Sequence, residues 1–228
     1  MRVLAFSGGK DSMACLHLCR DEIDVAIYVD TGKAYPETLA MVEYAKAIVD
    51  VMTIRTDQSA QNAEQGIPAD VVPADYTASG HVFSGAKAIK IQDYLSCHYQ
   101  NIAYPLFLRA LDINAGSVIY GQRNTETRKS PARNGMQIGT ITRLHPIEDW
   151  TSEQVMSYLA TKMEIPEHYK IEHSSLDCYD CTAFRSSSHD RVEYTRLNYP
   201  DFYAEYKARM GSITQALRES GYMEIGNG

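Results

Sequence analysis

The first quarter of the chain alternates short apolar runs with amphipathic stretches. The apolar runs predict strands at 2–6, 25–29 and 51–55, and the intervening segments predict helices at 11–20 and 37–49. Pro36 suits the first position of the second helix, where a missing N–H costs nothing. Strands that alternate with helices are typical of a parallel sheet. We therefore predict a Rossmann-like, doubly wound α/β fold with a mostly parallel sheet and flanking helices.

The rest of the chain has a less regular pattern. It predicts a partly helical stretch at 86–97, a helix at 106–114, a strand at 117–120, an extended segment at 138–147, and helices at 153–163 and 191–221, the last one broken near 198–200. The segment 57–85 is rich in Gln, Asn, Ala, Gly and Pro without a period, so we expect an irregular excursion there. We predict an α/β domain at 1–150 and a helical C-terminal extension at 151–228 that carries Cys178 and Cys181, together forming one compact unit.

Composition and charge narrow the class of protein. The chain has 228 residues, of which 44% are hydrophobic, so it can bury a sizeable core. A net charge of −7 without a basic run gives no sign of general nucleic-acid binding. We expect no membrane span, because no apolar stretch is long enough, and no signal peptide, because the N-terminus runs directly into the first strand. The five cysteines, an odd number, favour the reducing cytoplasm over a disulfide framework.

The most informative motif follows the first predicted strand and opens the first predicted helix. It reads Ser7-Gly8-Gly9-Lys10-Asp11-Ser12. The glycines allow the backbone to approach an anion closely, and the first free N–H groups of the helix point toward it. Lys10 adds a positive charge, and the two serines add hydroxyl donors. This strand, glycine turn and helix predict a phosphate site, although a tight turn without a ligand is the plainer alternative.

Two further turns follow predicted strands. Asp30-Thr31-Gly32 ends the second strand, and the segment from Gly121 to Arg128 follows the fourth. In open parallel sheets ligands bind at the carboxyl ends of the strands. Because all three turns belong to that edge, we predict that they contribute to one nucleotide site.

These motifs carry a family resemblance. The hexapeptide at 7–12 resembles the PP-loop, SGGxDS, of the adenine nucleotide alpha-hydrolase-like superfamily. The segments 30–38, 121–128, 145–151 and 165–182 are similar to the DTGxxxPET, GxRxxExxxR, PxxDW[ST] and IP…CxxCT segments of the phosphoadenosine phosphosulfate (PAPS) reductase family. The resemblance spans roughly residues 1–205. It implies an enzyme that binds an adenine nucleotide and acts at its α-phosphate.

The resemblance also implies roles for individual residues. The nucleotide would be bound by Ser7, Gly8, Gly9, Lys10, Asp11, Ser12, Asp30, Thr31, Gly32, Gly121 and Arg123. The residues that act in catalysis would be Lys10, Asp11, Arg123 and Arg128. Asp11 and Asp30 are candidate Mg²⁺ ligands, since this ion prefers oxygen ligands and phosphates. A helix cap is an equal alternative for Asp11, and an exposed, salt-bridged loop is the alternative for the two arginines.

The cysteines form a second candidate site. Cys178-x-x-Cys181 has the spacing of a metal, cluster or redox pair. Iron–sulfur members of the family carry an adjacent Cys-Cys pair before a Pro-Leu, and Cys97-His98 precedes Pro105-Leu106 here. The resemblance thus implies a [4Fe-4S] cluster on Cys97, Cys178 and Cys181, with His98 as a fourth ligand or an open iron. A Cys₃His zinc site, a redox dithiol and metal-free thiols stay open.

Two departures from the reductases favour ATP over PAPS or adenosine phosphosulfate as the nucleotide. Reductases of the family usually lack the PP-loop lysine, whereas ATP-splitting members keep it, as this chain keeps Lys10. The reductases also use a cysteine near the C-terminus, and no cysteine follows Cys181. We therefore expect adenylation with pyrophosphate release, coupled to sulfur transfer to an unidentified acceptor.

Two other functions stay open. The first is sulfonucleotide reduction with an external thiol, and the second is a nucleotide-binding partner subunit without turnover. The acceptor and the oligomeric state, whether a homo-oligomer or a complex with a partner protein, cannot be read from these motifs.

Overall fold

The structure is a computed structural model that describes residues 1–85, 88, 90–126, 130–171, 176 and 178–223. The chain divides into two compact units. The sheet unit comprises Met1–Asp30, Ala34–Arg55 and Tyr104–Leu176, and the cysteine unit comprises Thr31–Lys33, Thr56–Ala103 and Asp177–Gly228. These units follow a different division from the one predicted at residue 150, and the predicted domain boundaries stay a prediction.

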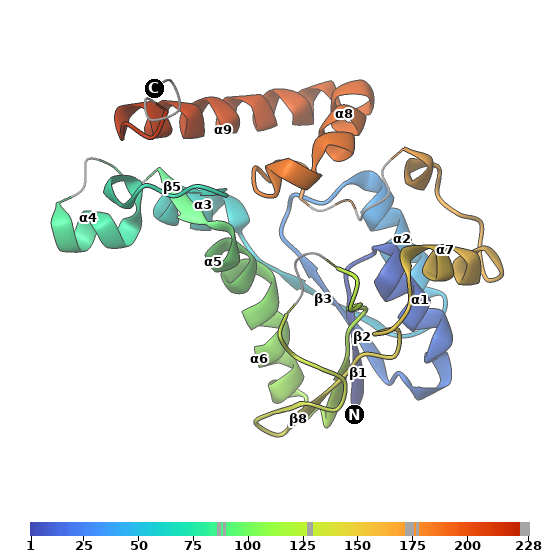
Figure 1. The fold of residues 1–228 in the computed structure, drawn as a ribbon. Coiled ribbons are helices and arrows are strands. Elements are labelled where there is room, and N and C mark those ends of the chain that lie inside the picture. The colour runs from blue at the N-terminus through green and yellow to red at the C-terminus, as the bar shows by residue number, and fades with distance from the viewer. Residues whose placement is uncertain (86–87, 89, 127–129, 172–175, 177, 224–228) are drawn as a thin grey trace. The chain divides into compact units, whose positions relative to one another are not determined.

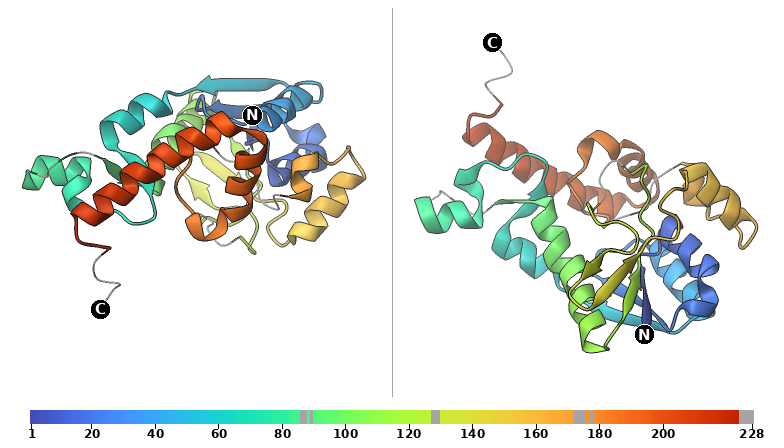
Figure 2. Two further views of the ribbon diagram at one scale, coloured as in Figure 1. Left: turned by 90° about the horizontal axis from the view of Figure 1, so that it is seen from above. Right: turned by 60° about the horizontal axis from the view of Figure 1, so that its bottom comes forward.

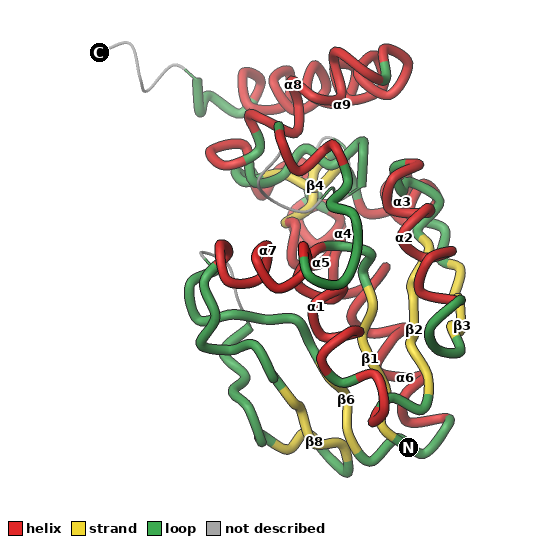
Figure 3. The backbone as a smooth tube through the Cα atoms, turned by 90° about the vertical axis from the view of Figure 1, so that its right-hand side faces the viewer, coloured by secondary structure: helices red, strands yellow, loops and turns green. Residues whose placement is uncertain are grey.

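The sheet unit is built on six strands in its described part, in the order β3-β2-β1-β6-β8-β7. The strands are β1 (Arg2–Phe6), β2 (Val25–Asp30), β3 (Val51–Arg55), β6 (Ser117–Ile119), β7 (Gln137–Ile138) and β8 (Ile141–Leu144). All neighbours pair in parallel except β7 and β8, which are antiparallel. Figure 3 shows β2, β1, β6 and β8 side by side. The predicted mostly parallel α/β sheet is confirmed.

Helices cover both faces of this sheet (Figures 1 and 2). The helical segments of the unit are α1 (Lys10–Leu18), η1 (Arg20–Glu22), α2 (Pro36–Lys46), α6 (Tyr104–Asp112), α7 (Ser152–Ala160) and η4 (Glu167–Lys170). Leu4 and Phe6 alternate along β1 and pack with α1, α2 and α7 in one core. Along the chain the strands are added outward from β1 to β3, and the next strand, β6, is added on the other side of β1. A right-handed connection in this opposite direction places α6 on the opposite face of the sheet.

The cysteine unit is mainly helical around a two-stranded parallel sheet. Its elements are α3 (Gln58–Gln65), β4 (Ile67–Ala69), η2 (Ala74–Tyr76), α4 (Ala78–Ser84), β5 (Ile91–Asp93), α5 (Tyr94–His98), η3 (Tyr99–Ala103), η5 (Arg185–Ser187), α8 (His189–Asn198) and α9 (Pro200–Glu219). Ile213 and Ala216 of α9 pack on Ala69, Tyr76 and Ile91. The predicted break between the last two helices is confirmed, with Pro200 opening α9.

The expected irregular excursion at 57–85 is wrong. This segment contains α3, β4, η2 and α4. Asp57 caps α3 by accepting from the Ala60 N–H at 2.9 Å, and Thr77 caps α4 by accepting from the Gly80 N–H at 2.9 Å. The sequence of α3, QSAQNAEQ, has only alanines as apolar residues. A hydrophobic period therefore could not reveal this helix, although its cap could.

No helix in the described ranges is long and apolar enough to span a membrane.

Candidate functional site

The PP-loop joins β1 to α1 in the sheet unit and is closed by its own serines. The Ser7 N–H donates to Ser12 Oγ at 3.3 Å, and the Ser12 hydroxyl donates to the Gly9 carbonyl at 2.9 Å. Gly8 has a φ of +78°, and a Cβ there would lie 2.9 Å from Thr38 Cγ2 on α2. Only glycine therefore fits this position. Gly9 caps α1 without any side-chain hydrogen bond to its free N–H groups, so this helix end can receive an anion.

Two buried cations stand at this loop. Lys10, in the first turn of α1, is 4% exposed, and Arg123, in the loop after β6, is 7% exposed. Arg123 Nε donates to Asp11 Oδ1 at 2.6 Å, and Lys10 Nζ lies 3.5 Å from Asp11 Oδ2. One carboxylate thus holds both cations at the start of α1. The helix-cap role that the sequence allowed for Asp11 is not what the structure shows, because its carboxylate pairs with Arg123.

The loop after β6 approaches the PP-loop closely because Gly121 lacks a side chain. A Cβ on Gly121 would lie 2.6 Å from the Asp11 carbonyl carbon and 2.8 Å from the Ser12 nitrogen. The parallel pairing of β1 with β6 ends both strands at the same edge, as expected for ligand sites in such sheets. The structure therefore brings Gly121 and Arg123 to the PP-loop, as the sequence predicted. Arg128, the other predicted catalytic arginine, lies outside the described residues.

Glu126 also belongs to this loop, although it was not singled out from the sequence. Its carboxylate accepts from the Arg123 N–H at 3.0 Å. Burial raises the pKa of Glu126 above its usual value, and the neighbouring Asp11 adds to this effect, while Arg123 and Lys10 act against it. The glutamate in GxRxxE was visible as a motif position, but its burial beside Asp11 was not.

The third predicted turn is shared by the two units. Asp30 is the last residue of β2 and lies two residues beyond Tyr28, the register partner of Phe6. It therefore ends at the same edge as the PP-loop. Thr31 and Gly32 belong to the cysteine unit, where the Thr31 hydroxyl lies 3.4 Å from Cys178 Sγ. Their predicted contact with a nucleotide stays a prediction.

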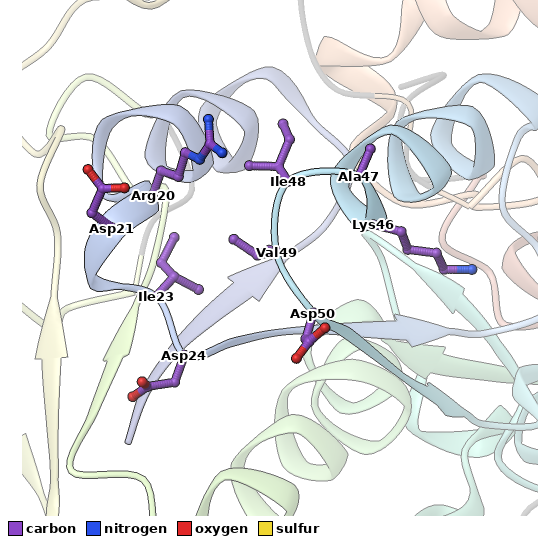
Figure 4. Close-up of a pocket in the computed structure, with 9 residues that line it drawn as sticks. All are labelled: Arg20, Asp21, Ile23, Asp24, Lys46, Ala47, Ile48, Val49 and Asp50. Carbon is purple, nitrogen blue, oxygen red and sulfur yellow. The ribbon is translucent and has the colours of Figure 1, made fainter.

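An open depression of about 440 Å³ lies at the other edge of the sheet (Figure 4). It is formed by the segments that lead into β2 and β3, at the amino ends of these strands. Its lining mixes charges of both signs and consists of Arg20, Asp21, Ile23, Asp24, Lys46, Ala47, Ile48, Val49 and Asp50. Because the PP-loop lies at the carboxyl ends of the strands, this depression is not the nucleotide site.

The cysteine unit contains all four predicted metal ligands. Cys97 is buried on α5, and its thiol donates to Asn62 Oδ1 at 3.5 Å and accepts from Asn101 Nδ2 at 3.7 Å. The Cys178 thiol donates to Gln58 Oε1 at 3.2 Å. Burial raises the pKa of Cys97 to about 11, and the nearby Cys181 contributes to this. A shared role for Cys97 and Cys181 stays a prediction.

As placed, the thiols do not form a ready ligand set. In the part of the chain that is described, no group of three or more His, Cys, Asp or Glu side chains could hold a metal ion. The sulfurs of Cys97 and Cys178 instead form hydrogen bonds with side-chain amides. The [4Fe-4S] cluster and the zinc site both stay predictions. Asp11 is paired with Arg123 and Lys10 in this structure, and its role as a Mg²⁺ ligand stays a prediction.

An ionic network at the C-x-x-C turn was missed by sequence reasoning. Asp180, between the two cysteines, is fully buried and accepts from Arg209 Nη1 of α9 and, at 3.2 Å, from Gln58 Nε2. Lys33 lies 3.7 Å from the same carboxylate and 2.6 Å from Glu205. Burial raises the pKa of Asp180, while Arg209 and Lys33 act in the opposite direction. These partners are dispersed along the chain, so no spacing could have linked them.

Comparisons with known proteins show the family of this chain. A profile of the phosphoadenosine phosphosulfate reductase domain matches residues 2–184, and the chain therefore belongs to this family. It is 26% identical over 170 residues to a phosphoadenosine 5'-phosphosulfate reductase of Alkalilimnicola ehrlichii, covering 73% of this chain and 63% of that one. It is also 27% identical over 199 residues to an uncharacterized protein of Methanocaldococcus jannaschii, covering 84% of this chain and 38% of that one. The chain thus spans less than two thirds of the length of both relatives.

A solved structure shares the fold. The phosphoadenylyl-sulfate reductase of Candida auris, in a phosphate complex, superimposes with a TM-score of 0.51 at 13% sequence identity, covering 79% of this chain and 82% of that one. Together with the family match, this likeness supports the same α/β fold for the chain.

Proposed function

We propose that the chain binds ATP at the PP-loop, transfers the adenylyl group to an acceptor and releases pyrophosphate. The observation that carries this proposal is Lys10, which is buried in the first turn of α1, beside the uncapped N–H groups of that helix. A nucleotide whose α-phosphate continues into a β,γ-diphosphate gives such a lysine a partner. Adenosine phosphosulfate and PAPS have no diphosphate at this position.

The residues of the PP-loop edge suit this reaction. An oxygen of the acceptor attacks the α-phosphorus, the bond from this phosphorus to the bridging oxygen breaks, and pyrophosphate leaves with its electron pair. Negative charge builds up on the phosphate oxygens, where Lys10, Arg123 and the first N–H groups of α1 can stabilise it. Asp11 orients Arg123 through the 2.6 Å hydrogen bond. Mg²⁺ would enter with the ATP phosphates, with Asp30 as a candidate ligand at this edge.

Lys10→Ala tests this proposal. Removing one donor to developing charge usually lowers kcat by about 10²–10³-fold, and we expect a loss of this size in acceptor-dependent pyrophosphate release. Lys46→Ala is the matched control, because Lys46 is an exposed lysine paired with Glu43 on α2. If neither the wild type nor the two variants released pyrophosphate with any acceptor tested, and ATP did not bind, the proposal would fail. ATP binding without product would favour the partner subunit without turnover.

Sulfonucleotide reduction is the second candidate, supported by the 26% identity to a phosphoadenosine 5'-phosphosulfate reductase. In this reaction an external thiol would attack the sulfur of the nucleotide, the bond from that sulfur to the phosphate oxygen would break, and the nucleotide would leave as a phosphate. A second external thiol would then release sulfite and form a disulfide with the first. A thermal shift separates the two candidates. ATP should raise the unfolding temperature more than PAPS if adenylation is correct, and the opposite order would favour reduction.

We further propose that adenylation is coupled to sulfur transfer, in which Cys97, Cys178 and Cys181 take part. All three thiols lie in one compact unit, and Cys181 acts electrostatically on Cys97. Metal and sulfide analysis of anaerobically purified protein tests this part. Iron with acid-labile sulfide would support a cluster, zinc alone would support the Cys₃His site, and neither would leave adenylation as the complete reaction.

A further inference from the structure

In the described part of the cysteine unit, only one of the three guanidinium nitrogens of Arg209 has a hydrogen-bond partner. Its Nη1 donates to Asp180, and the whole side chain is 12% exposed. Nε and Nη2 are closed to solvent and have no hydrogen-bond partner in the described ranges. Buried donors on a charged group are costly to leave unpaired. Arg209 therefore has the means to bind one more acceptor.

The geometry of the guanidinium specifies the kind of acceptor. Nε and Nη2 lie on the same edge of the planar group, and their N–H bonds point in parallel. This edge matches two oxygens of one oxyanion, which it binds through two parallel charge-assisted hydrogen bonds. A single carbonyl or hydroxyl oxygen would leave one of the two donors unpaired.

The surrounding charges and residues point the same way. Asp180 is fully buried and shares its negative charge between Arg209 and Lys33, and Lys33 is also paired with the half-exposed Glu205. Asp180 alone thus does not use the full hydrogen-bonding capacity of the two cations. Arg209 also acts electrostatically on the Cys97 thiol, so its unpaired edge belongs to the neighbourhood of the candidate cysteine site. It lies outside the residues matched by the family profile, which end at 184.

We propose that the Nε–Nη2 edge of Arg209 is a binding site for a tetrahedral oxyanion, inorganic sulfate or phosphate, next to the cysteines. This site is separate from the PP-loop and does not depend on adenylation. Because both nitrogens are closed to solvent, the anion reaches them only when α9 or the C-x-x-C turn moves. Anion binding then makes hydrogen bonds that stabilise both segments, so it slows their amide exchange with solvent.

Hydrogen–deuterium exchange of the full chain tests this proposal, with sulfate, phosphate or chloride at matched ionic strength. Sulfate or phosphate should slow exchange in α9 and around 178–181 relative to chloride, and the larger effect identifies the preferred anion. Arg209→Lys keeps the charge but lacks the edge, so it should lose this anion-dependent slowing. Arg209→Gln removes the charge as well and should lose it too. Arg218→Gln, at an exposed position of the same helix, should retain it.

Lys10→Ala separates this site from the PP-loop. The variant should lose anion protection at 7–12 but keep it in α9. Three results would overturn the proposal: equal exchange of α9 in chloride, sulfate and phosphate; full anion protection in Arg209→Lys; or protection confined to 7–12. Because Arg209→Lys retains a cation for Asp180, the test remains decisive even if Arg209→Gln fails to fold.

Discussion

The PP-loop and the C-x-x-C turn are both short bends that gather polar groups, but they are held in different ways. The PP-loop is shaped by glycine backbone and by hydrogen bonds among residues within five positions of one another. The C-x-x-C turn is held by a buried carboxylate whose partners come from 33, 58 and 209. The residues that shape the PP-loop thus form one contiguous motif, whereas the residues that hold the C-x-x-C turn come together only when the chain folds. Loss of a distant ionic partner should therefore disturb the C-x-x-C turn more than the PP-loop.

Asp180→Ala should give the largest effect. It leaves Arg209 and Lys33 without their buried partner, and removing one member of a buried ion pair costs about 3–5 kcal/mol. Urea unfolding measures the loss in the free energy of unfolding. Asp190→Ala is the control, because the Asp190 side chain is 57% exposed. A loss below about 1 kcal/mol for Asp180→Ala would mean that the C-x-x-C turn is held by local bonds after all.

The reactivity of the thiols sharpens the same comparison. Burial raises the pKa of Cys97 to about 11 from a usual value of 9.0, so at neutral pH its reactive thiolate is about a hundredfold less abundant than for an ordinary thiol. In metal-free protein, alkylation followed by mass spectrometry should therefore label Cys97 far more slowly than Cys178, which is half-buried. Raising the pH toward 11 should narrow the gap. Equally fast labelling of both at neutral pH would contradict this.

The two regions also differ in how much of them the sequence predicted. The strands and the PP-loop edge could be predicted because their signals are local: apolar runs, the glycine-containing hexapeptide at 7–12, and turns that directly follow strands. Family resemblance placed Arg123 at the same site. The charge pairing of Arg123 with Asp11 was not predictable, since it depends on how β6 aligns with β1.

Less of the cysteine unit could be predicted. The spacing of Cys178 and Cys181 indicated a site, but nothing linked Asp180 to Arg209, which lies 29 positions away. Helix α3 was missed because its exposed face and its ends are polar, and its buried residues are Gln58 and Asn62. The side-chain oxygens of these two amides accept hydrogen bonds from the thiols of Cys178 and Cys97. The buried face of α3 is thus polar because its amides form hydrogen bonds with the thiols, and for the same reason a hydrophobic pattern does not indicate this helix.

Gly121→Ala tests whether the PP-loop depends on close backbone approach. The new Cβ would lie 2.6 Å from the Asp11 carbonyl carbon, and overpacking of this kind costs about 1–3 kcal/mol. We expect a lower unfolding temperature and weaker ATP binding, because the start of α1 must shift. Gly116→Ala is the control, since its Cβ would meet nothing closer than 3.9 Å. Unchanged ATP binding in Gly121→Ala would show that the loop after β6 is not part of the site.

The smallest expected effect concerns Glu126 and pH. Burial raises its pKa above the usual glutamate value, with Asp11 adding to the shift. The folded protein therefore binds this proton more tightly than the unfolded chain, and the resulting stability is present at low pH and lost as the pH rises through the raised pKa. Above this pKa the ionised Glu126 adds a negative charge beside Asp11. ATP binding should then weaken by about threefold, the size expected for one charge several ångströms away in a solvated site.

Glu126→Gln isolates this effect from the titration of ATP itself. The variant keeps a side-chain oxygen that can accept from the Arg123 N–H, as Glu126 does at 3.0 Å, but it carries no charge at any pH. Calorimetric titration of both proteins over a series of pH values should give dissociation constants that agree below the raised pKa and diverge above it, with the wild type binding more weakly at the higher pH. Parallel curves would mean that Glu126 does not influence the nucleotide. The charge balance of the PP-loop edge would then rest on Lys10, Asp11 and Arg123.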